Sequence, residues 1–162
     1  MRRLLILIMA IIVLALVNFE IYKKEQLLAK GTTVLLKLAP RDPRSLMQGD
    51  YMVLRYDIAR LPALTAAERD GYLVITRDDK QVAHFKRIYD ETTPLAADEL
   101  LLRFRKRGHE IRLGAESFFF QEGQAKCYNN ARYGEIRLAT SGESVLVGLR
   151  DAEFKRLLEQ CH

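Results

Sequence analysis

The chain has 162 residues, 49% of them hydrophobic and 29% charged, and its 26 basic and 21 acidic residues leave a net charge of +5. This excess is too small and too dispersed for a nucleic-acid-binding protein, so we expect no nucleic acid partner. With a membrane segment set aside, the remaining length suffices for one domain of roughly 130 residues with its own core.

An apolar segment lies near the N-terminus. Residues 4–17 are apolar without interruption, and the run extends over residues 4–22, about 19 residues, if two polar residues are tolerated near one interface. That length is the lower limit for crossing about 30 Å of hydrocarbon. The alternative is a cleaved signal peptide, but the sequence Leu16-Val17-Asn18-Phe19-Glu20 offers no small-residue cleavage site. We therefore predict an uncleaved transmembrane anchor that contacts the membrane through residues 4–22.

Basic residues lie on both sides of this segment, with Arg2 and Arg3 before it and Lys23, Lys24 and Lys30 after it. The positive-inside rule therefore does not decide the orientation. A short N-terminus before a first anchor usually stays in the cytoplasm. We predict a single-pass protein whose domain lies outside the cytoplasm.

Helix-forming residues continue from the anchor to Lys30, and Gly31 is a natural C-terminal stop. The pattern then changes to a strand over residues 33–38. Pro40 and Pro43 end this strand, because proline cannot continue a ladder of hydrogen bonds.

Alternating patterns predict the elements that follow. In the strand predicted over residues 51–58, one face carries Met52, Leu54, Tyr56 and Ile58. Further strands are predicted at residues 72–76, 81–89, 100–105, 110–113, 135–139 and 144–149, with turns at Gly108 and Ser141-Gly142. Short helices are predicted between Gln124 and Arg132, and from Asp151 as N-cap through Gln160. The chain is thus predicted to be mainly β, with an anchor and juxtamembrane helix over residues 1–31 and an antiparallel β domain over residues 32–162.

The stretch Gly49-Asp50-Tyr51-Met52-Val53-Leu54-Arg55-Tyr56 resembles the GDYXXLXY family at every fixed position, and a second block over residues 119–135 is similar to the same family. The motif residues on which the resemblance rests are Gly49, Asp50, Tyr51, Leu54, Tyr56, Glu122, Gly123, Arg132, Tyr133 and Gly134. The resemblance implies a bacterial envelope protein in the inner (cytoplasmic) membrane, with its domain facing the periplasm and no established activity. Relatives are often encoded beside multi-pass membrane proteins, which implies a partner of that kind.

The motif residues also have a purely structural interpretation. Gly49 supplies a permissive turn, which Asp50 caps through nearby amides. Tyr51 and Tyr56 fall on opposite faces of a strand, so one ring is expected in the core. Glu122, Arg132 and Glu135 are expected to form an ion-pair cluster, and the alternative is that Arg132 clamps a carboxylate of a peptide or partner.

A more distant resemblance, over residues 40–134, is to membrane-anchored signal peptidases of the serine–lysine type. It rests on Gly49-Asp50, on Phe85-Lys86-Arg87-Ile88 and on the aromatic run that leads into Glu122-Gly123. The family serine would lie eight residues before Gly49, where this chain has Arg41. Arginine cannot be the nucleophile, so a hydrolase would have to use Ser45, with Lys86 as base.

Other candidate residues give weaker signals. The three histidines do not fall at metal-ligand spacing with carboxylates, so we expect no metal and no cofactor. Cys127 and Cys161 are able to pair in an oxidising compartment, but the spacing does not decide it. Arg103, Arg105 and Arg107 are expected on a solvated strand face, with an acidic envelope ligand as the alternative.

These observations predict a non-enzymatic accessory or interaction domain that is anchored in the membrane and serves another membrane protein. The alternative is an anchored serine–lysine peptidase that uses Ser45 and Lys86.

Overall fold

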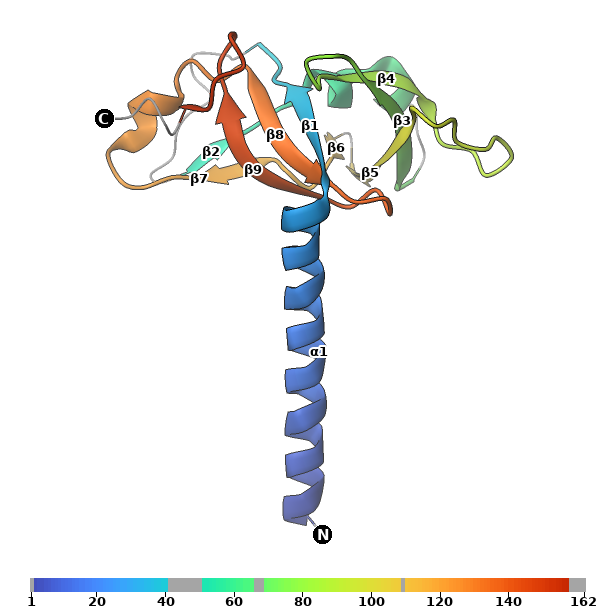
Figure 1. Ribbon diagram of the computed structural model, residues 1–162, viewed down its shortest axis with the longest axis vertical. Helices are drawn as coiled ribbons and strands as arrows, with labels where there is room; N and C mark the ends of the chain where they lie inside the picture. The colour runs from blue at the N-terminus through green and yellow to red at the C-terminus, as the bar shows by residue number, and fades with distance from the viewer. Residues whose placement is uncertain (1, 41–50, 66–68, 109, 158–162) are drawn as a thin grey trace.

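A computed structural model describes residues 2–40, 51–65, 69–108 and 110–157 (Figure 1). It places a small β domain at one end of a long, isolated helix. The helical elements are α1 (Arg2–Lys30), α2 (Pro62–Thr65) and two 3₁₀ turns, η1 (Asp57–Arg60) and η2 (Gln124–Tyr128). The strands are β1 (Thr32–Lys37), β2 (Tyr51–Val53), β3 (Gly71–Arg77), β4 (Ala83–Ile88), β5 (Leu100–Arg107), β6 (Glu110–Arg112), β7 (Ser117–Phe119), β8 (Tyr133–Leu138) and β9 (Ser144–Arg150).

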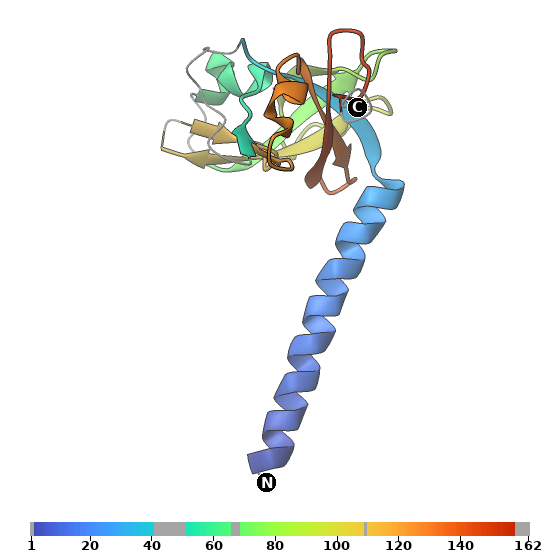
Figure 2. The ribbon, with the colours of Figure 1, turned by 90° about the vertical axis from the view of Figure 1, so that its left-hand side faces the viewer.

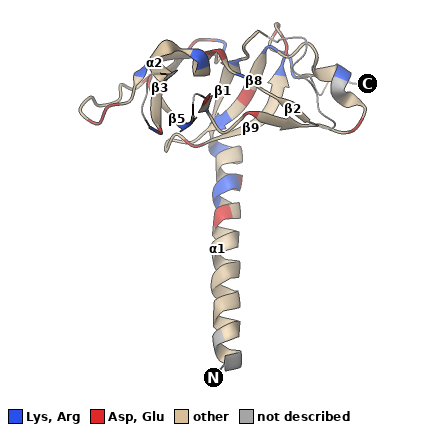
Figure 3. Ribbon diagram, turned by 180° about the vertical axis from the view of Figure 1, so that it is seen from behind, with Lys and Arg blue, Asp and Glu red and all other residues tan. Residues whose placement is uncertain are grey.

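Helix α1 is long and apolar enough to cross a membrane, and its described apolar side chains between Leu4 and Tyr22 are exposed, whereas Leu27 is buried next to the domain. Its charged residues gather next to the domain, and the stretch below them carries none as far as Leu4 (Figure 3). The helix ends at Lys30, as predicted, and the Gly31 amide still donates the last helical hydrogen bond, of 2.8 Å, to the Leu27 carbonyl. A Cβ at Gly31 would collide with that same carbonyl, so only glycine turns the chain into β1 without strain.

Three antiparallel sheets make up the domain. Their strand orders are β1-β8-β9, β2-β7 and β4-β3-β5-β6. Isolated bridges join the sheets, since Leu35 of β1 pairs with Val82 before β4, and Leu38 after β1 pairs with Tyr56. The mainly β, antiparallel prediction is confirmed. Seen from the side, the domain overhangs α1 in one direction, so much of its lower surface faces the side from which α1 extends (Figure 2).

One apolar core connects the sheets. Leucine, isoleucine and valine side chains from β1, β3, β5 and β8 fill its centre, among them Val34, Leu73, Leu102 and Ile136, each fully buried. Val34 and Ile136 are cross-strand partners, as are Leu73 and Leu102. Because alternate residues of a strand share a face, these pairs line the inner face of each sheet.

The strand predicted over residues 51–58 is shorter than expected. Strand β2 ends at Val53, and Asp57–Arg60 forms η1, in which the Ala59 amide bonds to the Tyr56 carbonyl at 3.1 Å. The predicted burial is nevertheless correct for Met52, Leu54 and Tyr56. The alternating pattern predicted which side chains enter the core. It did not predict that the pairing of β2 with β7 ends at Val53.

The two predicted C-terminal helices are also corrected. Only a 3₁₀ turn, η2, forms within residues 124–132. Asp151 accepts amide hydrogen bonds as an N-cap would, but from Glu153 at 3.0 Å and Lys155 at 2.8 Å in a turn rather than a helix. Phe154 has a positive φ of 65°, which ends any helical path there. Residues 158–160 of this prediction lie outside the described residues.

Candidate functional site

Tyr56 is the buried centre of the first motif block. Its hydroxyl donates a hydrogen bond of 2.5 Å to the carbonyl of Ala115, and only 1% of the residue is exposed. Burial, with a smaller effect from the charge of Glu116, raises the pKa of Tyr56, so the hydroxyl stays protonated as a donor. Leu54 is buried beside it in the same core. Gly49 and Asp50 lie outside the described residues, so their predicted turn stays a prediction.

The second motif block meets the first at Gly134. A Cβ at this position would lie 3.0 Å from both Cε1 and the hydroxyl oxygen of Tyr56. Glycine therefore leaves the space that the tyrosine ring occupies. Gly134 lies in β8 and pairs with Leu36 of β1, so the contact joins the central sheet to the segment after β2. Sequence alone did not show this contact, because 78 positions separate the residues numbered 56 and 134.

The other tyrosines of the motif lie in aromatic pairs. Tyr51 of β2 faces Phe119 of β7 across the strands, with ring centroids 5.7 Å apart. Tyr133 stacks on Phe154 with centroids 4.9 Å apart. As predicted, Tyr51 and Tyr56 lie on opposite sides of their segment, with Tyr56 in the core and Tyr51 only partly buried.

Strands β2 and β7 form a ribbon whose outer face exposes two large hydrophobic side chains beside the polar Ser117. Phe119 is 73% exposed and Val53 is 54% exposed, although both are large hydrophobic residues. Met52 and Phe118, which pair on the opposite face, pack into the core. We call the three apolar and aromatic residues of this outer face, Tyr51, Val53 and Phe119, the aromatic ribbon face. The ribbon lies low on the domain, on the side from which α1 extends (Figures 1 and 2).

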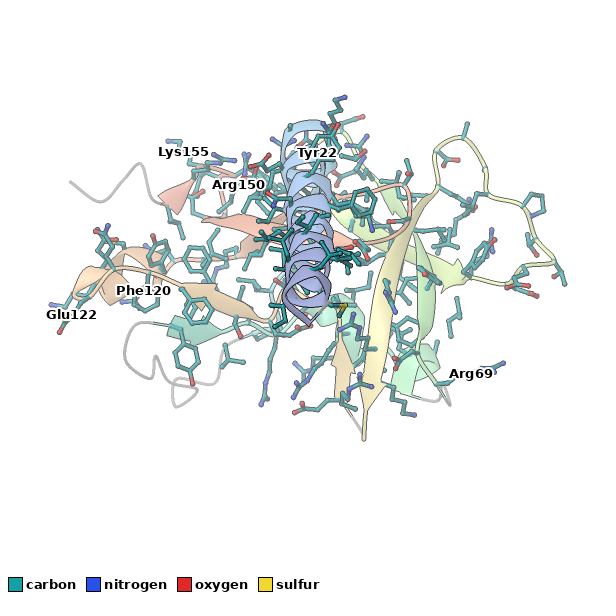
Figure 4. The ribbon with its side chains drawn as sticks, turned by 90° about the horizontal axis from the view of Figure 1, so that it is seen from below. Tyr22, Arg69, Phe120, Glu122, Arg150 and Lys155 are labelled. Atoms are coloured by element: carbon teal, nitrogen blue, oxygen red, sulfur yellow. The ribbon has the colours of Figure 1, made fainter. Side chains whose placement is uncertain are left out.

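The expected ion-pair cluster of Glu122, Arg132 and Glu135 is wrong. Glu135 instead bonds to Nε of Arg150 at 2.8 Å and to Nη2 of Arg156 at 2.7 Å. Glu122 is exposed at the tip of the loop between β7 and η2, on the far left of the view along α1 (Figure 4). Arg132 contributes through its backbone, since its amide donates to the Arg150 carbonyl at 2.8 Å.

Glu135 is a buried carboxylate held as an ion. Its side chain is 2% exposed, and burial alone would favour the neutral acid. Although burial is the largest single influence and raises the pKa, hydrogen bonds and charges from Arg156 and Arg150 outweigh it and lower the pKa to about 2. This arrangement ties β8, β9 and the C-terminal turn together. It is a structural ion-pair network, since both arginines are already engaged by Glu135.

Lys86 is placed as a surface cation rather than a catalytic base. Its Nζ lies 2.9 Å from the Glu99 carboxylate, which also binds Arg87 at 3.0 Å. The hydrogen bond and charge of Glu99 raise the pKa of Lys86, whereas a general base requires a lowered one. Strand β4 lies at the outer edge of its sheet, at the opposite end of the domain from the Glu122-Gly123 loop (Figures 1 and 4). The signal-peptidase resemblance would bring Lys86 close to the Glu122-Gly123 loop, and the structure places them apart. Ser45 lies outside the described residues.

The basic residues on β5 separate into two environments. Arg107 lies 3.6 Å from Asp70, at the end of the strand. Arg103 and Arg105 instead line a pocket together with Arg112, which the sequence analysis did not select. The predicted burial of this strand is correct, because Leu102 and Phe104 point into the core.

The histidines, carboxylates and cysteines of the described residues form no metal cluster. Within the described residues, no three His, Cys, Asp or Glu side chains lie together as a metal site would require. Cys127 is disulfide-bonded, and Cys161 is the only other cysteine in the sequence. Gly123 has a φ of 83° and precedes η2, which accounts for a glycine at this motif position.

The fold and its motif contacts define a class of protein, a small antiparallel β domain carried on one helix that is long and apolar enough to span a membrane. A family model described as GDYXXLXY protein matches residues 13–149. The chain therefore belongs to the GDYXXLXY family. No curated protein and no solved structure gives a significant match.

Proposed function

We propose that this chain is an accessory protein of the inner membrane that is anchored by α1, holds its β domain in the periplasm and docks on a multi-pass membrane protein through the aromatic ribbon face. No catalytic step is assigned to it. The observation that carries the proposal is the exposed ribbon face itself, because Phe119 and Val53 are the most exposed large hydrophobic residues among the described residues of the β domain.

The anchor supports the membrane half of the proposal. All apolar side chains between Leu4 and Tyr22 that the structure describes are exposed, and a bilayer would remove this surface from water. The disulfide at Cys127 supports an oxidising compartment such as the periplasm, because cytosolic thiols are kept reduced.

The ribbon face supports the partner half. Aromatic residues are enriched in the buried centres of protein interfaces, where they contribute large contact areas. Phe119 and Val53 lie on adjacent strands, so together they form one patch rather than scattered contacts. The ribbon of β2 and β7 belongs to the overhanging part of the domain, so a partner embedded next to α1 would lie close to this ribbon (Figures 1 and 2).

A photo-crosslinking amino acid at Phe119 in the full-length chain tests the docking surface. We expect cross-links to one multi-pass membrane protein, identified by mass spectrometry after solubilisation. The matched control carries the same group at Leu95, which is 40% exposed in the loop between β4 and β5, and should give no such product. Equal products from both positions, or products with lipid alone, would contradict docking through this face.

Topology is tested separately. A phosphatase reporter fused after His162 should be active, and a cytoplasmic fluorescent reporter at the same site should not fluoresce. The opposite pattern would place the domain in the cytoplasm and would contradict the periplasmic part of the proposal, whatever the cross-linking result.

A further inference from the structure

A second surface feature lies directly beside α1. It is a pocket of about 190 Å³ between α1 and the ends of strands β5, β6 and β9. The view along α1 shows these strands around the helix (Figure 4). The residues that line it are Lys24, Arg103, Arg105, Arg112, Leu113, Gly114, Glu143 and Ser144.

The pocket is strongly basic. Four of its lining residues are cations and one is a carboxylate. Arg105 and Arg112 are direct cross-strand partners, an arrangement in which like charges repel and destabilise the sheet. Arg103 lies two positions from Arg105 and therefore on the same face of β5. Within the described part of the chain, neither Arg103 nor Arg105 has a carboxylate partner, so these charges are available to an anion.

The nearby carboxylates neutralise little of this charge. Glu143 lies 3.4 Å from Lys24, and Glu110 lies 3.4 Å from Arg112. All four side chains are half or more exposed, and ion pairs of this kind contribute little to stability. A phosphate that replaced Glu143 at Lys24, or Glu110 at Arg112, would therefore cost little stability.

The pocket walls are held by hydrogen bonds between the elements. The Arg103 amide donates to the Gly142 carbonyl at 2.9 Å, and the Ser144 hydroxyl donates to the Leu113 carbonyl at 3.2 Å. Gly142 has a φ of 83°, and a Cβ there would lie 2.9 Å from the Tyr72 ring. The β8–β9 turn is therefore fastened to β5, which fixes the arginines relative to α1.

The position of Lys24 along α1 indicates the level of the pocket relative to the bilayer. If residues 4–22 cross the hydrocarbon, they span about 28 Å at 1.5 Å per residue. Lys24 then lies about 3 Å beyond the hydrocarbon boundary, within the layer of lipid headgroups. Arginine binds phosphate oxygens through paired N–H donors, so the charge, chemistry and depth all match a lipid phosphate.

We propose that this pocket binds the phosphate of an anionic phospholipid, such as phosphatidylglycerol, in the leaflet that faces the domain. The inference rests on the membrane anchor of the proposed function, but not on the protein partner. A bound headgroup would hold the overhanging domain in one orientation on the bilayer, with α1 as its pivot.

The test uses tryptophan fluorescence, because the chain contains no tryptophan. Ile21→Trp places a fluorophore one helical turn below Lys24 on the same face of α1. The full-length variant is reconstituted in phosphatidylcholine vesicles that contain either brominated phosphatidylglycerol or brominated phosphatidylcholine at the same mole fraction. We expect brominated phosphatidylglycerol to be preferred about fivefold over brominated phosphatidylcholine next to the tryptophan. This factor corresponds to the attraction between one basic residue and an anionic lipid surface.

Two matched double variants identify the pocket. In the Ile21→Trp background, Arg105→Gln with Arg112→Gln should reduce the preference to less than about twofold. Arg60→Gln with Arg69→Gln removes the same charge from exposed positions outside the pocket and should leave it unchanged. Equal quenching by the two lipids, an equal loss in both double variants, or abolition of the preference by millimolar inorganic phosphate would each overturn the lipid site. Quenching by neither lipid would show that α1 is not in the bilayer and would overturn the membrane anchor as well.

Discussion

Replacing Glu135 by glutamine is expected to lower the free energy of unfolding by about 3–5 kcal/mol. The substitution keeps the size of the side chain but removes the charge that compensates Arg150 and Arg156. Both arginines are partly buried, so each loses its counter-charge without regaining full hydration. Chemical unfolding of the full chain in detergent, followed by circular dichroism, measures the change. Glu122→Gln removes an exposed carboxylate from the same motif block and should change stability by less than about 0.5 kcal/mol.

The same residue gives a pH dependence with a defined sign. In the folded chain the pKa of Glu135 is lowered from 4.5 to about 2. Between these values the unfolded state binds the proton and the folded state does not, so stability falls as the pH falls from about 4.5 toward 2. The contribution lost is on the order of 3 kcal/mol at most, since one pKa unit corresponds to about 1.4 kcal/mol and the arginines are partly exposed. The difference in stability between the unmodified chain and Glu135→Gln should shrink over this range, and a constant difference would show that Glu135 is not ionised.

Patterns in the sequence correctly predicted those features of the fold that depend on residues close together in the chain. The helix end at Gly31 follows from one residue type, and the burial of Met52, Leu54 and Tyr56 follows from alternation. The partners of Glu135 did not follow, because proximity in sequence favoured Glu122 and Arg132. Arg150 reaches Glu135 because β9 pairs with β8 from the other side of a hairpin.

The candidate sites show the same division. Alternation placed Arg103 and Arg105 on one outer face, but Arg112 joins them through a strand register that the sequence does not specify. Lys24 joins them because α1 lies against β9 at the base of the domain. For Lys86, the resemblance of residues 85–88 to signal peptidases suggested a catalytic base. The pairing with Glu99 depends on a carboxylate brought in by the segment before β5, which motif spacing does not encode.

Replacing Tyr56 by alanine is expected to lower the free energy of unfolding by about 3–5 kcal/mol, the usual effect of removing a large buried aromatic side chain. The cavity would open where the two motif blocks meet, against Gly134 and the Ala115 carbonyl. Tyr56→Phe keeps the ring but leaves that carbonyl without its donor, so we expect a loss of about 1–2 kcal/mol. Both are measured by chemical unfolding of the full chain in detergent. A loss below about 1 kcal/mol for Tyr56→Ala would contradict the role assigned to this residue.

Gly134→Ala tests the contact from its other side. The added methyl group would meet the Tyr56 ring and hydroxyl at 3.0 Å, so the core must shift, and we expect a loss of about 1–3 kcal/mol. Gly148→Ala is the matched control, because Gly148 lies in the adjacent strand β9 and a Cβ there meets no atom within 4 Å. Combining Gly134→Ala with Tyr56→Phe removes the hydroxyl that the methyl group would meet. The loss of stability in the double variant should therefore be smaller than the sum of the two single losses by about 0.5 kcal/mol or more, as expected for residues in direct contact. If the two losses were strictly additive, or if Gly148→Ala caused an equal loss, the contact between Tyr56 and Gly134 would not couple the two motif blocks. Packing would then not explain why this chain contains both blocks.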